Sequence, residues 1–177
     1  AYTAGEIERL TQYAQHIYFN SAQQLAHFGD QVRAAGAKIG LRVNPGYSNA
    51  TLGGALYDPC APCSRFGEIA DRLRDIDWGG VDIFHVHSLC ESLHEGSIGL
   101  IDHVAKHFGE YVSQVSAGNF GGGHFINKEG YDLGALIDAV RDFRQHFNVD
   151  VIFEPGGGLV VNTGEMVTTV LALHHND

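Results

Sequence analysis

The sequence lacks any apolar run of the roughly 20 residues that a membrane-spanning helix needs. Its amino terminus also lacks the basic and then apolar stretch of a secretory signal peptide. Positive charge is scarce, because 11 lysines and arginines stand against 21 aspartates and glutamates, which gives a net charge of −10. This balance argues against nucleic acid and anionic membranes as partners. It is compatible with a cationic substrate, although an ordinary acidic cytosolic protein has the same balance.

Cysteine is also scarce, with Cys60, Cys63 and Cys90 as its three occurrences. An odd number of thiols favours a reducing compartment over a disulfide framework, so we predict a cytoplasmic protein. Cys60 and Cys63 have CxxC spacing, for which redox or zinc chemistry is an option. A four-thiolate zinc site would need a second pair, and only Cys90 remains.

The composition is that of a folded globular protein, with 44% hydrophobic and 18% charged residues. Apolar strand-like segments alternate five times with segments of helical periodicity, which predicts parallel strands joined by crossover helices. The predicted strands lie at residues 16–20, 38–44, 114–120 and 149–154, and a further buried strand starts the stretch 81–91, which ends in polar side chains. The predicted helices lie near residues 3–13, 21–36, 66–73, 97–111 and 132–147.

Polar residues mark the starts of three of these helices. Thr3 with Glu6 and Ser21 with Gln24 have the spacing of a capping box, in which each side chain bonds the backbone of the other residue. Asp132 is predicted to cap the last helix.

Two architectures share this alternation, a doubly wound sheet and a piece of a (β/α)8 barrel. Polar and glycine-rich stretches end nearly every predicted strand, rather than clustering at one switch point, which favours the barrel. A complete barrel takes roughly 250 residues. We therefore predict an α/β fold that is a partial barrel of about five βα units.

The strand that starts at Val81 runs into His85 and His87. These histidines are two residues apart, so both face one side of the strand, as a metal-binding HxH pair would. A histidine at the end of a parallel strand could instead act as a base, stack on a cofactor ring, or merely hydrogen-bond within the barrel.

Two further strand ends carry residues with chemical potential. Gly121–Gly123 lacks Cβ atoms, so its backbone N–H groups could cradle a phosphate, although a flexible turn has the same composition. The triplet is neither GxGxxG nor a Walker motif. Glu154 ends an apolar strand, where a carboxylate is costly unless it meets a proton donor or a cation such as Arg42 or Arg65. Arg42, inside a strand, needs an acceptor for the same reason.

Together these stretches resemble the fold-type III pyridoxal-phosphate decarboxylases, in which a barrel is joined to a β-domain. The glycine triplet and Glu154–Gly156 indicate this superfamily. The loop Pro59–Pro62 and the strand end His87–Glu91 narrow the resemblance to the carboxynorspermidine/carboxyspermidine decarboxylases. The matching segments follow family order along essentially the whole chain: 19–21, 40–45, 57–62, 64–67, 85–91, 121–124, 154–156 and 162–164.

The resemblance implies pyridoxal 5′-phosphate as cofactor and loss of CO2 from carboxynorspermidine or carboxyspermidine, a polyamine-type substrate, as the reaction. It also implies roles for particular residues. His87 would stack on the cofactor ring, Glu154 would pair with the pyridinium nitrogen, Arg42 would lie behind the cofactor, and Gly121, Gly122, Gly123 and Gly156 would hold the phosphate.

The resemblance further implies that this chain is the central part of a homodimeric enzyme. Residues 1–158 would form part of the cofactor-binding barrel, and residues 159–177, rich in β-branched side chains, would start a C-terminal β-domain. The Schiff-base lysine of the family would lie on a strand upstream of residue 1, because Lys38, Lys106 and Lys128 match no such strand. The chain alone is then expected to lack covalently bound cofactor and to be inactive.

One position departs from the family pattern, since Gly157 stands where an acidic residue usually follows Glu154–Gly156. The alternatives are another fold-type III decarboxylase acting on diaminopimelate, ornithine or arginine, and a non-catalytic relative that binds phosphate or partners. A metal hydrolase using His85 and His87 is a third.

Overall fold

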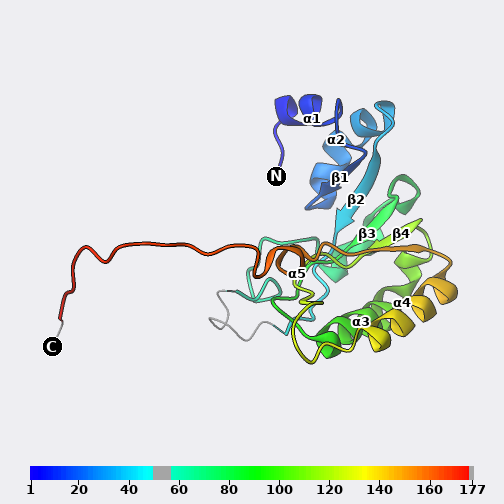
Figure 1. The fold of residues 1–177 in the computed structure, drawn as a ribbon. Helices are drawn as coiled ribbons and strands as arrows, with labels where there is room; N and C mark the ends of the chain where they lie inside the picture. Colours follow the sequence, from blue (N-terminus) through cyan, green and yellow to red (C-terminus); the bar gives the residue numbers. More distant parts are fainter. Residues whose placement is uncertain (50–56, 176–177) are drawn as a thin grey trace.

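A computed structural model describes residues 1–49 and 57–175 of the chain. Its centre is a parallel sheet of five strands within these residues (Figure 1). The strands follow one another across the sheet in sequence order, each hydrogen-bonded in parallel to the next. In a doubly wound sheet, the order in which strands are added reverses at a switch point. The uninterrupted order seen here therefore confirms the predicted partial barrel. The strands are β1 (His16–Phe19), β2 (Lys38–Arg42), β3 (Ile83–His85), β4 (Ala117–Asn119) and β5 (Asp150–Ile152).

Helices connect these strands and lie outside the sheet (Figure 1). None of the helices in the described residues is long and apolar enough to cross a membrane. The α-helices are α1 (Ala4–Leu10), α2 (Ala22–Ala34), α3 (His94–Val112), α4 (Leu133–Phe147) and α5 (Gly156–Val160), and the 3-10 helices include η2 (Ala70–Asp75) and η3 (Trp78–Gly80).

The predicted caps largely form. The capping box of α1 is complete, because the Thr3 hydroxyl accepts from the Glu6 N–H and the Glu6 carboxylate accepts from the Thr3 N–H at 2.7 Å. Asp132 accepts from the Ala135 N–H at the start of α4. At α2 the Ser21 hydroxyl accepts from the Gln24 N–H, but the return bond is not formed within the described residues and the buried Gln24 Oε1 has no partner there.

Aromatic and aliphatic side chains fill the space between the sheet and α3. Ile101, Val104 and Phe108 are buried on the inner face of α3, as their helical spacing predicts. Phe84 of β3 stacks on Trp78 with ring centroids 5.8 Å apart and contacts Phe108 at 5.7 Å. Burying side chains of this size stabilises the fold by about 1.5–3 kcal/mol each.

The prediction of a helix near residues 66–73 is wrong for residues 66–69, which are not helical. Glu68 forms an isolated bridge with Val43 after β2, donating its N–H to Arg42 O at 2.8 Å and accepting from Asn44 N–H at 2.9 Å. Gly67 has a φ of +84° and lies against the backbone of Val43 and Asn44. This extended pairing prevents helix formation, so only η2 follows it, with Leu73 buried.

The strands expected between residues 159 and 173 are also not observed. Gly156–Val160 is the short helix α5, and residues 161–175 contain no strand. This C-terminal segment runs out from the rest of the molecule (Figure 1), and its apolar side chains Met166, Val167 and Leu171 are 89%, 92% and 94% exposed. A strand needs a hydrogen-bonded neighbour, and no strand of the described residues pairs with this segment. The division into a barrel over 1–158 and a β-domain from 159 stays a prediction.

Candidate active site

Strand register brings the predicted site residues together at the carboxyl edge of the sheet. His85, Asn119 and Ile152 end β3, β4 and β5 and lie opposite one another. His87, Gly121 and Glu154 each stand two positions further on. Alternate residues of a strand share a face, so these three positions point to the same side. The Glu154 N–H donates to Gly121 O at 2.8 Å, which continues the pairing beyond β5.

The glycine triplet packs directly against the segment after β3. Gly121 has a φ of +65°, and a Cβ there would lie 2.6 Å from the Cβ of His87. A Cβ on Gly122 would lie 3.3 Å from the His87 ring and 3.0 Å from Glu154 O. Gly123 has a φ of +89° and lies against the carbonyl of Leu89. The absence of side chains is therefore a steric requirement at this edge and not only a source of flexibility.

The backbone donors of the triplet differ in availability. Gly121 donates its N–H to Asn119 Oδ1 at 2.8 Å. The N–H groups of Gly122 and Gly123 have no hydrogen-bond partner among residues 1–49 and 57–175. These two are the donors that could reach an anion such as a phosphate.

Asn119 organises the site, although nothing in the sequence pattern singled it out. Its side-chain amide is buried and donates to Glu154 Oε1 at 2.8 Å and to the Tyr18 hydroxyl at 2.9 Å. Its Oδ1 accepts from Gly121. One side chain thus joins β1, the glycine triplet and the acidic strand end. Its position as the last polar residue of a buried strand was the signal that could have identified it.

Glu154 lies exposed at the edge of the site, with one carboxylate oxygen bound to Asn119. The salt bridge to Arg42 or Arg65 that the sequence left open is not formed in the described structure. Arg42 instead donates to the backbone carbonyl of His87 at 3.0 Å and lies 4.7 Å from the centre of the Phe66 ring. Burial lowers the pKa of the Arg42 guanidinium.

The two histidines of β3 have different surroundings. His85 is 7% exposed and contacts the Tyr18 ring edge-on, with centroids 4.9 Å apart. Both of its ring nitrogens are buried without a hydrogen-bond partner among the described residues. Burial, followed by the charge of Arg42 and by His87, lowers the pKa of His85 to about 3. His87 is half-buried, and burial and then Arg42 lower its pKa, against a smaller opposite effect of Glu154. Both rings are therefore neutral at physiological pH.

His124, which follows the triplet, is a further residue to which the sequence assigned no role. It is fully buried, with Nδ1 2.8 Å from the Ser97 hydroxyl and Nε2 3.2 Å from Phe120 O. The Ser97 hydroxyl also lies 2.9 Å from the Tyr131 hydroxyl. This network anchors both ends of the glycine triplet to α3.

The CxxC loop does not form a redox or metal centre in the described structure. Cys60 and Cys63 are free thiols, and Cys60 donates to Tyr47 O at 3.4 Å. Burial and the nearby Asp58 raise the pKa of Cys60 to about 11, so its thiol stays protonated. Neither cysteine joins a cluster of three metal donors within the described ranges.

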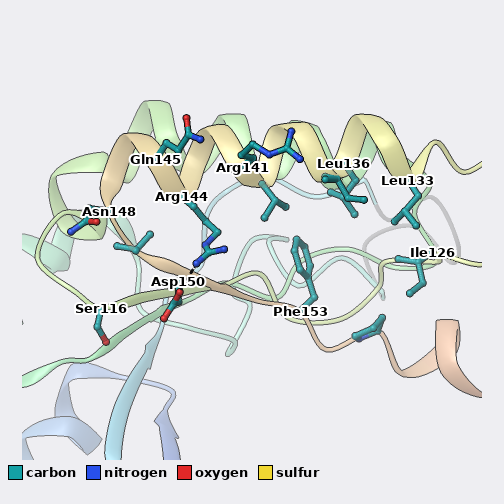
Figure 2. A pocket seen from close by; sticks show the side chains of 14 residues that line it. Ser116, Ile126, Leu133, Leu136, Arg141, Arg144, Gln145, Asn148, Asp150 and Phe153 are labelled. Carbon is teal, nitrogen blue, oxygen red and sulfur yellow. Dashed lines mark hydrogen bonds and ion pairs between the residues drawn. The ribbon is translucent and has the colours of Figure 1, made fainter.

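A large groove lies away from these residues (Figure 2). It has a volume of about 880 Å³ and runs between α4 and the unpaired edge of β5. Leu136, Phe153 and the ion pair Arg144–Asp150, with an N–O distance of 2.8 Å, line it. A second cavity of about 210 Å³ is lined by Tyr18, Arg42 and His85 and adjoins the site. The candidate catalytic residues therefore lie at the carboxyl edge of the sheet, whereas the large groove lies along its open side, at β5.

No protein-family model matches the chain. Among curated proteins, the chain is 33% identical over 177 residues to a carboxynorspermidine/carboxyspermidine decarboxylase of Campylobacter jejuni, covering 100% of this chain and 45% of that protein. It is 35% identical over 170 residues to a carboxyaminopropylagmatine decarboxylase of Synechocystis, covering 96% of this chain and 43% of that protein.

The solved structures agree with these relatives. The fold matches carboxynorspermidine decarboxylase complexed with norspermidine, from Campylobacter jejuni, with a TM-score of 0.79 and 30% identity over 90% of this chain and 40% of that chain. A diaminopimelate decarboxylase matches with a TM-score of 0.65 and 18% identity over 90% of this chain and 41% of that one, which shows the shared fold alone. The predicted resemblance is thus confirmed: over its whole length the chain is similar to the carboxynorspermidine/carboxyspermidine decarboxylases, and it spans less than half of the relatives it matches.

Proposed function

We propose that the chain is the central part of a pyridoxal-phosphate-dependent carboxy-lyase that converts carboxynorspermidine or carboxyspermidine to norspermidine or spermidine. The observation that carries this proposal is the convergence of His87, the glycine triplet and Glu154 at one edge of the sheet. The 33% identity to a carboxynorspermidine/carboxyspermidine decarboxylase along all 177 residues supports it.

The residues present fit the cofactor that the relatives imply. The His87 ring is neutral and half-buried, so it can lie flat against an aromatic ring. The N–H groups of Gly122 and Gly123, which have no partner among the described residues, are suited to a phosphate, whereas the Gly156 N–H already donates to Glu154 O at 2.7 Å. Gly121 packs closely against His87, and this contact keeps the N–H groups of Gly122 and Gly123 beside the His87 ring.

Glu154 would hold a proton on the cofactor ring nitrogen. Asn119 binds Oε1 and fixes the carboxylate, and Oε2, which has no hydrogen-bond partner in the described part of the chain, can accept from a protonated nitrogen. When bound, the cofactor supplies an electron sink for the electron pair left as CO2 departs. Arg42 supports the site from behind, because it holds the carbonyl of His87 in place.

None of the three lysines lies beside this set of residues. Lys38 starts β2, at the opposite end of the sheet from His87. Lys106 is an exposed residue of α3, and Lys128 lies 5.5 Å from the ring of Phe125 in an exposed loop. We therefore propose that residues flanking this sequence supply the covalent lysine, and that the chain alone binds the cofactor without turnover.

A second substrate is favoured by a specific observation. The relative named for carboxyaminopropylagmatine is 35% identical, as similar to this chain as the carboxynorspermidine/carboxyspermidine enzymes are. Gly157 stands where the family usually has an acidic residue. It is exposed, and a Cβ added to it would meet no described atom within 4 Å, so the substrate amine would meet a different surface here.

The test uses a protein that carries this chain together with its flanking sequence. Carboxynorspermidine, carboxyspermidine, carboxyaminopropylagmatine, diaminopimelate, ornithine and arginine are supplied separately, and CO2 and amine products are measured by mass spectrometry. We expect product from one of the first three. Product from diaminopimelate, ornithine or arginine alone would contradict the proposed substrate class. For the chain alone, an absorbance band with pyridoxal phosphate that borohydride abolishes would contradict the assignment of the lysine to flanking residues.

We also propose that the whole protein is a cytoplasmic homodimer. The three free thiols are consistent with a reducing compartment. Light scattering on the whole protein tests the dimer, and a monomeric mass would overturn it.

A further inference from the structure

Three potential metal donors meet at the carboxyl edge of the sheet. His85, His87 and Glu154 each offer one ligand atom, and these atoms all lie within 4.8 Å of one another. We propose that this cluster binds one divalent transition-metal ion, best matched by Zn2+, when no organic cofactor occupies the site. Two histidines and one glutamate, with a fourth position open to water, form one of the donor sets of known zinc sites. This inference rests on the donor geometry and stands apart from the proposed decarboxylase activity.

The state of His85 is the second observation that points to a ligand. Its side chain is 7% exposed, yet both ring nitrogens lack a hydrogen-bond partner among residues 1–49 and 57–175. Buried polar atoms are nearly always bonded, so an unpartnered imidazole at the edge of a cavity requires an explanation. His85 also lines the 210 Å³ cavity beside Tyr18 and Arg42.

The surroundings orient the other two donors. Asn119 donates to Glu154 Oε1 at 2.8 Å and is itself held by the Tyr18 hydroxyl, which is the kind of outer contact that fixes a metal-binding carboxylate. His87 is attached two residues beyond β3 and packs against Gly121 and Gly122, so its ring has little room to turn away.

The charged groups near the cluster are Arg42 and Glu154. The Arg42 guanidinium opposes a bound cation, but its donor group is directed to the carbonyl of His87 and its face to the Phe66 ring. The Glu154 carboxylate is a ligand and offsets one positive charge. His124 also faces His87, but its own ring atoms are engaged by Ser97 and Phe120.

If the decarboxylase proposal is correct, metal and pyridoxal phosphate need the same side chains, His87 and Glu154. The two would then exclude one another, and zinc would inhibit loading of the organic cofactor.

The experiment measures metal binding to the chain without pyridoxal phosphate. Other histidines are first removed as competitors: His103 and His107 lie one turn apart on α3 with ring centroids at 4.5 Å, and His174 and His175 lie on the exposed tail. The reference protein therefore carries His107→Gln, His174→Ala and His175→Ala. Zn2+ binding is followed by calorimetry, and Co2+ by its visible absorption, which reports coordination geometry.

We expect one equivalent of Zn2+ in the reference protein. His87→Gln and Glu154→Gln, each added to it, should weaken binding at least about tenfold and change the Co2+ spectrum. Glu110→Gln, an exposed carboxylate on α3, is the matched control and should change neither. Circular dichroism checks that each variant is folded. No uptake by the reference protein, or affinity unchanged by both site variants, would overturn the metal site.

Titration with pyridoxal phosphate separates this proposal from the proposed function. Zinc binding that depends on His87 and Glu154 but is not displaced by pyridoxal phosphate would support the metal site and count against the cofactor assignment. Pyridoxal phosphate binding that depends on the same residues, without any zinc uptake, would overturn the metal site alone.

Discussion

Asn119 is the residue on which the geometry of the candidate site depends most. It makes three hydrogen bonds, to Glu154, Tyr18 and Gly121, from a buried position at the end of β4. Its partners come from segments more than 30 residues away on either side as well as from its own loop. A single side chain therefore couples the acid of the site to the glycine triplet.

Asn119→Ala should destabilise the protein by about 1–3 kcal/mol, because it leaves buried groups without partners. It should also weaken pyridoxal phosphate binding, since Glu154 and the N–H of Gly121 lose their fixed positions. Urea unfolding and a cofactor titration measure the two effects. Asn119→Asp keeps the acceptor for Gly121 but loses both donors and places a second carboxylate beside Glu154, so it too should weaken cofactor binding. Unchanged cofactor affinity in both variants would contradict this role.

His85 should make the free energy of unfolding decrease as the pH falls. Its pKa is about 3 in the folded protein and about 6.5 when unfolded, so the unfolded chain takes up the proton first as pH falls. The free energy of unfolding should therefore decrease below about pH 6.5 and continue to decrease toward pH 3, by at most about 1.4 kcal/mol per pH unit from this group. Urea unfolding between pH 7 and pH 4.5 measures the slope.

His85→Phe should make that slope shallower, because a group that cannot titrate no longer favours the unfolded chain in acid. His107→Gln, on the exposed face of α3, is the control and should leave the slope as it is. Equal slopes in the wild type and His85→Phe would show that His85 is not the cause.

At the scale of elements, the spacing of the strand ends decides which residues meet. The aligned ends of β3, β4 and β5 place His87, Gly121 and Glu154 side by side, each two residues beyond its strand. The triplet then bridges two strand ends because its backbone can approach the segment after β3 without a Cβ in the way.

Alanine substitutions in the triplet should separate packing from anion binding. Gly121→Ala should destabilise the fold by about 1–3 kcal/mol, because its φ is +65° and its Cβ would lie 2.6 Å from that of His87. Gly122→Ala meets its neighbours at 3.0 Å or more, so it should cost less stability while weakening phosphate or pyridoxal phosphate binding. Gly5→Ala in α1, with open space around it, is the control. Thermal unfolding and calorimetry test this, and equal losses for Gly121→Ala and Gly5→Ala would contradict it.

At the scale of the whole molecule, the sheet is open on the side of β5. The groove between α4 and β5 and the partly exposed apolar residues Leu133 and Ile137 lie where a closed barrel would continue (Figure 2). The C-terminal segment adds exposed apolar side chains but little contact with the body (Figure 1). Stability should therefore reside in the sheet and its helices.

Substitutions in the tail and the core test this distribution. Met166→Ser with Val167→Ser should leave the free energy of unfolding within about 0.5 kcal/mol of the wild type, because both side chains are exposed. Phe143→Ala on the buried face of α4 should cost about 3–5 kcal/mol, through lost burial and the cavity left behind. Guanidinium unfolding measures both. A large loss from the tail variant would mean that this segment packs on the body in solution.

The sequence by itself determined the alternation of strands and helices, the caps at Thr3 and Asp132, and the candidate residues His87, Gly121–Gly123 and Glu154. These features depend on local periodicity and on the chemistry of single residues, which can be read along the chain. Only the tertiary structure decided the role of Asn119, the pairing of Glu68 with Val43 in place of a helix, and the meeting of His85, His87 and Glu154. These depend on strand register between segments dozens of residues apart, and that register is set by packing of the whole sheet.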